Sequence, residues 1–259
     1  MKVKDVMTED VILVDKDVEL EYVLKLMKKH EITKIPVVED KKLIGIITDN
    51  KIAYKLGSIR SRGVPASRLH ASSVTDKEMD VVSPITEIES ILKKVGEPGA
   101  TMLPVVENEK LVGVVTKADL LPFVNSNKKL KELMQKKLHT ISPSDRVIHA
   151  RRLMIDENVA RLPVVDQRTL VGIISDTEIA FALASLKRSI SLGKQKHALD
   201  ELLVEDVMKT STIWAEPDIT ASEAAKIMIK NNIGSLPLID NDKIVGIITR
   251  TDLIKTISY

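Results

Sequence analysis

One pattern recurs four times along this chain and restricts its fold more than any other feature of the sequence. Each copy has a proline between apolar residues, a glycine nine residues later, and a threonine or serine three residues after the glycine. The four prolines are Pro36, Pro104, Pro163 and Pro237. Blocks of 36 residues align around them without a gap, over 16–51, 84–119, 143–178 and 217–252. Such self-similarity predicts repeated supersecondary units, here called repeats 1 to 4.

Each repeat has the apolar pattern of a small unit in the order strand, helix, strand, strand, helix. Seven positions around the proline are Ile, Leu or Val in all four copies, which is typical of two buried β-strands. Polar segments between these strands predict hairpin turns at Glu39–Lys42, Glu107–Lys110, Asp166–Thr169 and Asp240–Lys243. A short opening strand is expected at Val11–Val14, Asp80–Val82 and Thr140–Ile141, and Trp214 lies on the equivalent strand of repeat 4. The second helix should begin at the Thr or Ser.

A unit of this kind leaves one apolar sheet face uncovered, so we expect the repeats to pair through their sheets. The prolines are separated by 68, 59 and 74 residues, which favours a two-plus-two division near residue 126. We therefore expect an α/β (α+β) protein of four β-α-β-β-α repeats. Their expected boundaries are 1–57, 70–126, 127–186 and 201–259, in pairs 1–126 and 127–259. An open solenoid of four units is the alternative.

Composition excludes several classes of function. The chain has no cysteine, which excludes disulfides, thiolate metal sites and cysteine nucleophiles. Only six residues are aromatic, so a base-stacking platform is not expected. The five histidines show no metal-ligand spacing, and no nucleophile–base pair is evident, so we expect neither a metal site nor an enzyme. No apolar run approaches the length of about 18 residues that a membrane helix needs, and we expect a cytoplasmic protein.

The four blocks resemble the CBS domain, the repeat named after cystathionine β-synthase. The resemblance is carried by Ile233–Ile239 and Val245–Leu253 in repeat 4, and by Asp-Val-Met at 5–7 and again at 206–208. It covers roughly residues 3–259. It implies two tandem pairs of repeats that bind an adenosine compound, such as AMP, ADP, ATP or S-adenosylmethionine, as a regulatory ligand in the clefts between paired repeats. It also implies a non-catalytic sensor that signals to a protein target still to be identified, with a homodimer as a further expectation.

An adenosine ligand needs an apolar slot that binds adenine, a carboxylate that binds the ribose diol, and hydroxyls or cations that bind phosphates. The residues expected at the slot are Ile233, Gly234, Ser235, Leu236, Pro237, Ala100, Thr101, Met102, Leu103, Pro104, Thr140 and Ala160. The expected phosphate contacts are Thr48, Thr116, Ser175, Thr249, Lys34, Arg161 and Arg250, the hydroxyls lying at helix N-termini that favour anions. The family's ribose-binding position falls on Asp119, Glu178 and Asp252. Repeat 1 has Lys51 there instead, which puts its ribose site in doubt.

Each of these assignments has a simpler alternative. A Thr with an acid three residues later is also a helix capping box, and the two roles can coexist. The cations can be ordinary solvated strand residues, and Trp214 is expected in the core rather than against a purine. A rival function is nucleic-acid binding through the basic linkers 52–72, 127–139 and 183–200. The near balance of 39 basic and 37 acidic residues favours scattered solvated charge instead.

Overall fold

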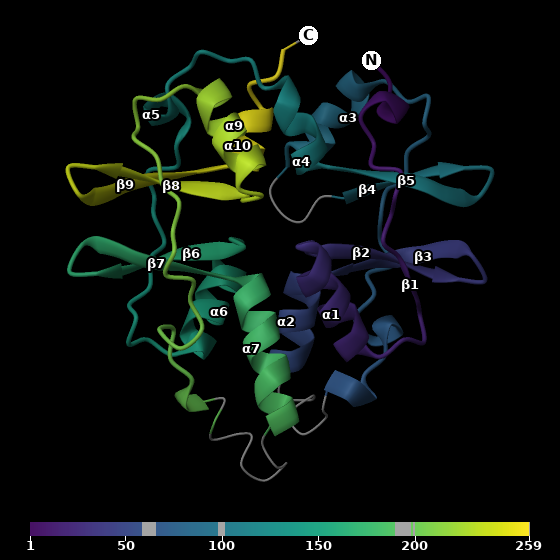
Figure 1. Cartoon of the computed structure of the whole chain (residues 1–259), viewed down its shortest axis with the longest axis horizontal. Helices are drawn as coiled ribbons and strands as arrows, with labels where there is room; N and C mark the ends of the chain where they lie inside the picture. The colour runs from purple at the N-terminus through teal and green to yellow at the C-terminus, as the bar shows by residue number, and fades with distance from the viewer. Residues whose placement is uncertain (59–65, 98–101, 190–197, 199, 259) are drawn as a thin grey trace.

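The computed structural model describes residues 1–58, 66–97, 102–189, 198 and 200–258. The four repeats surround a common centre, with a strand pair from each repeat at the periphery and most helices between them (Figure 1). Repeat 1 contains β1 Val14–Asp15, α1 Leu20–His30, β2 Lys34–Glu39, β3 Lys42–Thr48 and α2 Asp49–Gly57. Repeat 2 contains α3 Ile88–Val95, β4 Met102–Glu107, β5 Lys110–Thr116 and α4 Lys117–Leu120. The arrangement is closed and is not an open solenoid.

Repeats 3 and 4 follow the same order of elements. Repeat 3 contains α6 Val147–Asp156, β6 Arg161–Asp166, β7 Thr169–Ser175 and α7 Asp176–Ser189. Repeat 4 contains α9 Ala221–Lys230, β8 Ser235–Asp240, β9 Lys243–Thr249 and α10 Arg250–Ile254, and the short helix α5 Leu130–Leu133 precedes repeat 3. The predicted mixture of α and β elements in four repeats is therefore confirmed.

The predicted hairpins form in all four repeats with the same register. In repeat 1, Ile35 pairs with Ile47 and Val37 pairs with Gly45, so alternate apolar side chains share the buried face. Both central turn residues have left-handed backbones, with φ of 49° at Asp40 and 65° at Lys41. This conformation belongs to the tight hairpin turn whose twist matches the flanking strands.

The opening strands are shorter than predicted. Only repeat 1 keeps a two-residue strand, and the next residue, Lys16, donates its backbone N–H to Val38 O at 3.0 Å. The aligned position is Pro84, Pro143 or Pro217 in the other repeats, and proline has no N–H to donate. Those repeats retain single parallel bridges, at Val82↔Val105, Ile141↔Val164 and Ala215↔Leu238.

The linker before each repeat crosses to the sheet of the neighbouring repeat. Asp76, which precedes repeat 2, forms a bridge with Ile46 in repeat 1, and Thr8 forms one with Val114 in repeat 2. Gln135 and Ile247, and Lys209 and Ile173, repeat this exchange between repeats 3 and 4. We call Thr8, Asp76, Gln135 and Lys209 the crossing residues. The exchange joins the repeats into two tandem pairs; the exact boundaries of the repeats and pairs stay a prediction.

The two pairs meet through the helices that follow the hairpins. Helix α2 of repeat 1 packs along α7 of repeat 3, and the shorter α4 and α10 meet on the other side of the centre (Figure 1). One apolar cluster contains buried residues of both repeats 1 and 3, among them Ile52, Leu56, Ile179 and Leu183. The first turns of all four helices consequently face the same central space.

Candidate functional site

A cavity of about 2100 Å³ lies where the four repeats meet. Its walls include the residues that lead into the hairpins of repeats 1, 3 and 4, and the first turn of the helix that follows each hairpin. Backbone hydrogen bonds hold these two segments together: Asp49 N–H donates to Thr33 O, Asp176 N–H to Ala160 O, and Arg250 N–H to Gly234 O, at 3.0–3.1 Å. Side chains at both positions are therefore directed toward the cavity.

Each repeat contributes to this cavity one cation that stands either two residues before the proline or directly after the threonine. Repeats 1 and 3 supply Lys34 and Arg161, both two residues before the proline. Repeats 2 and 4 supply Lys117 and Arg250, both directly after the threonine. We call these four residues the central cations. The first position carries a cation in repeats 1 and 3, and the second position carries one in repeats 2 and 4. The four cations therefore follow the approximate twofold relation between the pairs.

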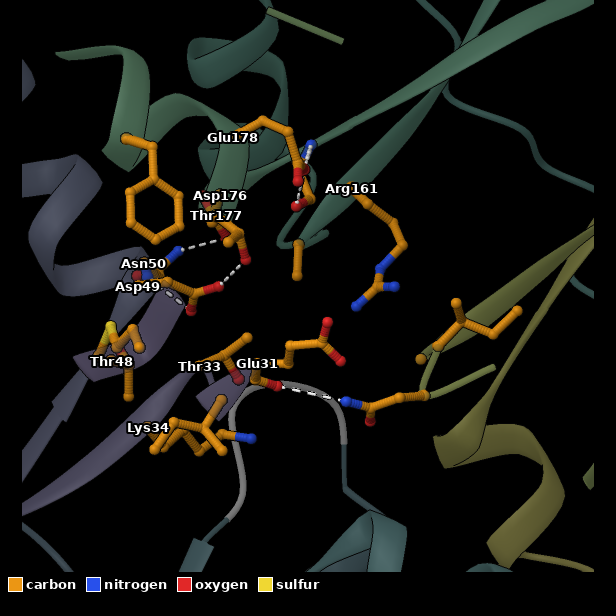
Figure 2. Close-up of a pocket in the computed structure, with 18 of the residues that line it drawn as sticks. Glu31, Thr33, Lys34, Thr48, Asp49, Asn50, Arg161, Asp176, Thr177 and Glu178 are labelled. Atoms are coloured by element: carbon orange, nitrogen blue, oxygen red, sulfur yellow. Dashed lines mark hydrogen bonds between the residues drawn. The ribbon is translucent and has the colours of Figure 1, made fainter. Parts of the chain in front are cut away.

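Lys34 and Arg161 extend into the same open space from β2 and β6 (Figure 2). Among the described residues, neither forms an ion pair, and the one hydrogen bond of Arg161 goes to Ser235 Oγ of repeat 4 at 3.4 Å. Burial lowers the pKa of Lys34 and that of Arg161, and the nearby carboxylate of Asp49 opposes both shifts. Two partly buried cations without a paired carboxylate form a favourable place for an anion.

The other two central cations are held in place by nearby loops. Arg250 donates from Nε to Ile233 O at 3.0 Å, and burial lowers its pKa. Lys117 donates from Nζ to Glu97 O at 2.6 Å and to Thr251 Oγ1 of repeat 4 at 2.7 Å. Burial lowers the pKa of Lys117 to about 8, and Lys34 contributes to the shift. These bonds fix both side chains at the wall of the cavity.

Two carboxylates, Asp49 and Asp176, face each other across the junction of α2 and α7. Asn50 Nδ2 donates to Asp176 Oδ2 at 3.0 Å, and Thr177 Oγ1 donates to Asp49 Oδ2 in the reciprocal contact (Figure 2). Burial raises the pKa of both groups, that of Asp176 to about 6. The whole cavity is lined by ten lysine or arginine residues and by ten carboxylates, so its formal charge is balanced.

We expect Asp176→Asn to stabilise the protein at neutral pH. The ionised carboxylate is only 4% exposed, and its pKa of about 6 lies above the ordinary value of 3.8. Each pKa unit corresponds to about 1.4 kcal/mol, so ionisation destabilises the folded state by about 2–3 kcal/mol above pH 6. This destabilisation fades as the pH falls from about 6 to 4, because the carboxyl group becomes protonated in both states.

Urea unfolding as a function of pH measures this effect. Asp176→Asn should raise the free energy of unfolding by about 2 kcal/mol at pH 7.5 and have no effect near pH 4. Asp156→Asn, at an exposed position on α6, is the matched control and should change little at either pH. A gain for Asp176→Asn that is equal at both pH values would contradict this explanation.

The predicted ribose carboxylates do form helix caps. Asp119 Oδ2 accepts from the N–H and Oγ1 of Thr116, both at 2.7 Å, and Asp252 Oδ2 accepts from those of Thr249 at 2.9 and 2.6 Å. Glu178 accepts in the same way from Ser175. The alternative interpretation as capping boxes is therefore confirmed, and it leaves one carboxylate oxygen of each residue for a second role.

The second oxygen of each of these carboxylates contacts a crossing residue. Thr8 Oγ1 donates to Asp119 Oδ1 at 2.9 Å, and Gln135 Nε2 donates to Asp252 Oδ1 at 3.3 Å. Lys209 Nζ lies 3.1 Å from Glu178 Oε1. In repeat 1 the charges are exchanged: Lys51 stands on the helix, and its Nζ lies 2.9 Å from Oδ2 of the crossing residue Asp76.

The structure gathers most of the predicted site residues at the cavity. Those that line it are Lys34, Thr48, Met102, Thr116, Asp119, Ala160, Arg161, Ser175, Glu178, Ile233, Gly234, Ser235, Thr249 and Arg250. Six predicted residues do not line it, namely Leu103, Pro104, Thr140, Leu236, Pro237 and Asp252. Leu103 and Leu236 point into the cores of their repeats, because alternate strand residues face opposite sides. Ala100 and Thr101 lie outside the described residues.

Two residues of the opening segments differ from expectation. Thr140 is exposed and does not line the cavity, because the chain there makes only a single bridge and then turns away. The expectation that Trp214 packs in the core is wrong, since the residue is 49% exposed. It directly precedes Ala215, whose side chain is buried, and successive residues of an extended segment face opposite sides.

Several residues of the cavity were not predicted. Lys117, Asp49 and Asp176 occupy the position after the hydroxyl, where Arg250 was already suspected. Comparing that position across all four repeats would have found them. The crossing residues left a weaker signal, since three of them directly follow the recurring methionines Met7, Met134 and Met208. Their contacts join segments that are far apart in the sequence, and the spacing of residues does not predict such contacts.

The structure describes the basic linkers only in part. Much of two of them, at 59–65 and 190–197, lies outside the described residues, so the nucleic-acid hypothesis stays a prediction. No group of three or more metal-ligating side chains occurs among the described residues. Within the same part of the chain, every helix is too short or too polar to cross a membrane.

Two proteins of Methanocaldococcus jannaschii are similar to the chain over most of its length. The uncharacterized protein MJ1404 is 28% identical over 273 residues, which cover 99% of this chain and 62% of that protein. The chain thus spans less than two thirds of this relative. The uncharacterized protein MJ1225 is 26% identical over 252 residues, with 90% of each chain covered.

The fold is also that of a solved structure. The crystal structure of MJ1225 superimposes with a TM-score of 0.86, covering 100% of both chains at 22% identity, which shows a shared fold. The sequence profile of the CBS domain matches four segments of this chain, residues 3–58, 71–126, 130–185 and 204–259. The chain therefore belongs to the CBS-domain family and contains four CBS domains arranged in two tandem pairs.

Proposed function

We propose that this protein is a non-catalytic sensor that binds adenine nucleotides with their phosphates directed toward the central cavity. One observation carries the proposal: all four repeats place a cation at the same cavity, and two of these cations have no paired carboxylate among the described residues. Pairs of CBS domains commonly bind adenosine ligands. The cavity of this chain adds the charge that a phosphate tail requires.

The walls of the cavity suit an adenosine group. Aliphatic residues such as Ile233 and Val114 line the cavity and offer apolar surface to an adenine ring. The second oxygen of Asp119 is held by a single hydroxyl, that of Thr8, and the ribose diol can compete for it. The capping role of the first oxygen keeps this carboxylate in a fixed orientation.

The central cations favour nucleotides over S-adenosylmethionine. Phosphate oxygens gain charge-assisted hydrogen bonds from Lys34, Arg161 and Arg250, whereas a sulfonium centre is repelled by the same groups. Each hydrogen bond to a charged group contributes about 1.5–3 kcal/mol. Affinity should therefore increase with the number of phosphates on the ligand.

Titration calorimetry with ATP, AMP, adenosine and S-adenosylmethionine tests this proposal. We expect ATP to bind at least tenfold more tightly than adenosine, with AMP between them and S-adenosylmethionine weaker than AMP. Raising the salt concentration should weaken ATP binding more than adenosine binding, because salt screens charges. Equal affinity for ATP and adenosine would refute the role of the central cations, and no binding by any of the four ligands would refute the function itself.

A ligand in this position contacts both tandem pairs and can favour one arrangement of them over another. It can shift that equilibrium only by its difference in affinity for the two arrangements. We propose that a protein target recognises the arrangement that the nucleotide stabilises. The absence of a ligand-dependent change in hydrogen exchange at α2, α4, α7 and α10 would contradict this part of the proposal.

A further inference from the structure

The four clefts share a contact between a helix residue and a crossing residue. The helix residue is three positions after the Thr or Ser, and the crossing residue comes from the paired repeat. The four contacts are Lys51–Asp76, Asp119–Thr8, Glu178–Lys209 and Asp252–Gln135. Each contact contains one carboxylate, although in repeat 1 that carboxylate stands on the opposite wall.

The clefts of repeats 1 and 3 carry the same charges in exchanged positions. Repeat 3 has a carboxylate on the helix, Glu178, and an ammonium on the crossing residue, Lys209. Repeat 1 has the ammonium on the helix, Lys51, and the carboxylate on the crossing residue, Asp76. Both members of each ion pair line the cavity. The cleft of repeat 1 therefore contains a carboxylate, although it stands on the crossing residue and not on the helix.

Asp76 is held in place as firmly as the capping carboxylates of the other repeats. Its backbone N–H donates to Ile46 O, and its carbonyl accepts from Ile46 N–H, both at 2.9 Å. Lys51 fixes one carboxylate oxygen, Oδ2, at 2.9 Å, while the backbone N–H of Glu78 lies 3.3 Å from the other. Each carboxylate oxygen can accept more than one hydrogen bond, so a diol can still be bound.

We infer that Asp76 is the ribose-binding carboxylate of the repeat 1 cleft, supplied by the crossing linker instead of the helix. This inference rests on the proposed nucleotide binding and goes beyond it by assigning a ligand group to the cleft that Lys51 had put in doubt. Lys51 orients the carboxylate through its ion pair. The cleft is then a fourth adenosine site.

The test isolates this cleft in the full-length chain. Asp119→Asn, Glu178→Gln and Asp252→Asn together weaken the other three clefts, and each amide keeps an oxygen to cap its helix. Titration calorimetry of this triple variant should retain binding of AMP at one site per chain. Adding Asp76→Asn should weaken that remaining binding at least tenfold, while adding Glu78→Gln, an exposed neighbour, should not change it.

Exchanging the charges of residues 51 and 76 distinguishes a contact with the ligand from a loss of folding. Lys51→Asp combined with Asp76→Lys, made in the triple variant, reproduces the arrangement of repeat 3 and should bind AMP at one site. Loss of AMP binding in the triple variant, or unchanged binding after Asp76→Asn, would overturn the assignment of Asp76. A wild-type chain that binds no AMP would instead refute the proposed function, so the two failures are distinguishable.

Discussion

Gly45→Ala should lower the free energy of unfolding by about 3 kcal/mol, at the upper end of the usual effect of overpacking. A methyl group at Gly45 would overlap the carbonyl oxygen of Asp76 and the side chain of Thr75, which belong to the crossing linker. The linker cannot move aside, because two backbone hydrogen bonds between Asp76 and Ile46 fix it against β3. Urea unfolding of the variant and the wild-type chain measures the change.

Gly246→Ala is the matched control, because it lies at the same position of repeat 4. There the nearest atom to an added methyl group is Met134 Sδ, at 2.5 Å, and a flexible methionine side chain can adjust. We expect Gly246→Ala to lower the free energy of unfolding by about 1 kcal/mol. If the two substitutions destabilise the protein equally, the rigid linker backbone is not the reason for glycine at position 45.

Arg161→Met should reduce the affinity for ATP by 10- to 100-fold and change the affinity for adenosine less than threefold. Arg161 enters the cavity as a planar group of donors without a paired carboxylate among the described residues, so its charge is available to phosphate. The loss corresponds to about one charge-assisted hydrogen bond, which contributes about 1.5–3 kcal/mol. Calorimetric titration with both ligands separates the two effects.

The ligand-free stability of the same variant is a second measurement. Burial lowers the pKa of Arg161, so its charge destabilises the empty protein, and methionine should leave the melting temperature equal or higher. Arg152→Met removes an exposed arginine from α6 of the same repeat and should affect neither affinity nor stability. A drop in melting temperature of Arg161→Met without a selective loss of ATP binding would mean that Arg161 is a structural residue.

Much of the fold could be predicted because the same apolar pattern occurs in all four repeats. The alternating apolar residues around Pro36 and the polar turn at Asp40 determine the hairpin locally, and the agreement of four copies removes the ambiguity of one short pattern. The length of the opening strand depended on a single N–H group, that of Lys16, which proline lacks in the other repeats. The effect of proline on this strand can be recognised in the sequence only when the acceptor, the carbonyl of Val38, is known.

The site was only partly predictable, because it depends on contacts between repeats. Lys34, Arg161 and Arg250 were suspected one repeat at a time, whereas their meeting with Lys117 follows from the packing of α2 on α7 and of α4 against α10. The recurring glycines were visible in the sequence, but their cause lies in the linkers that cross above them. Local patterns do not report such long-range contacts.

The two junctions between the tandem pairs differ in the way they are built. At α2 and α7 a single apolar cluster extends through repeats 1 and 3. Repeats 2 and 4 are divided between two clusters, which exchange Leu121 and Val124 of repeat 2 for Ile254 of repeat 4. Helices α2 and α7 also pack along a greater length than α4 and α10. Separating the first junction should therefore cost more apolar burial, and we expect any opening between the pairs to begin at α4 and α10.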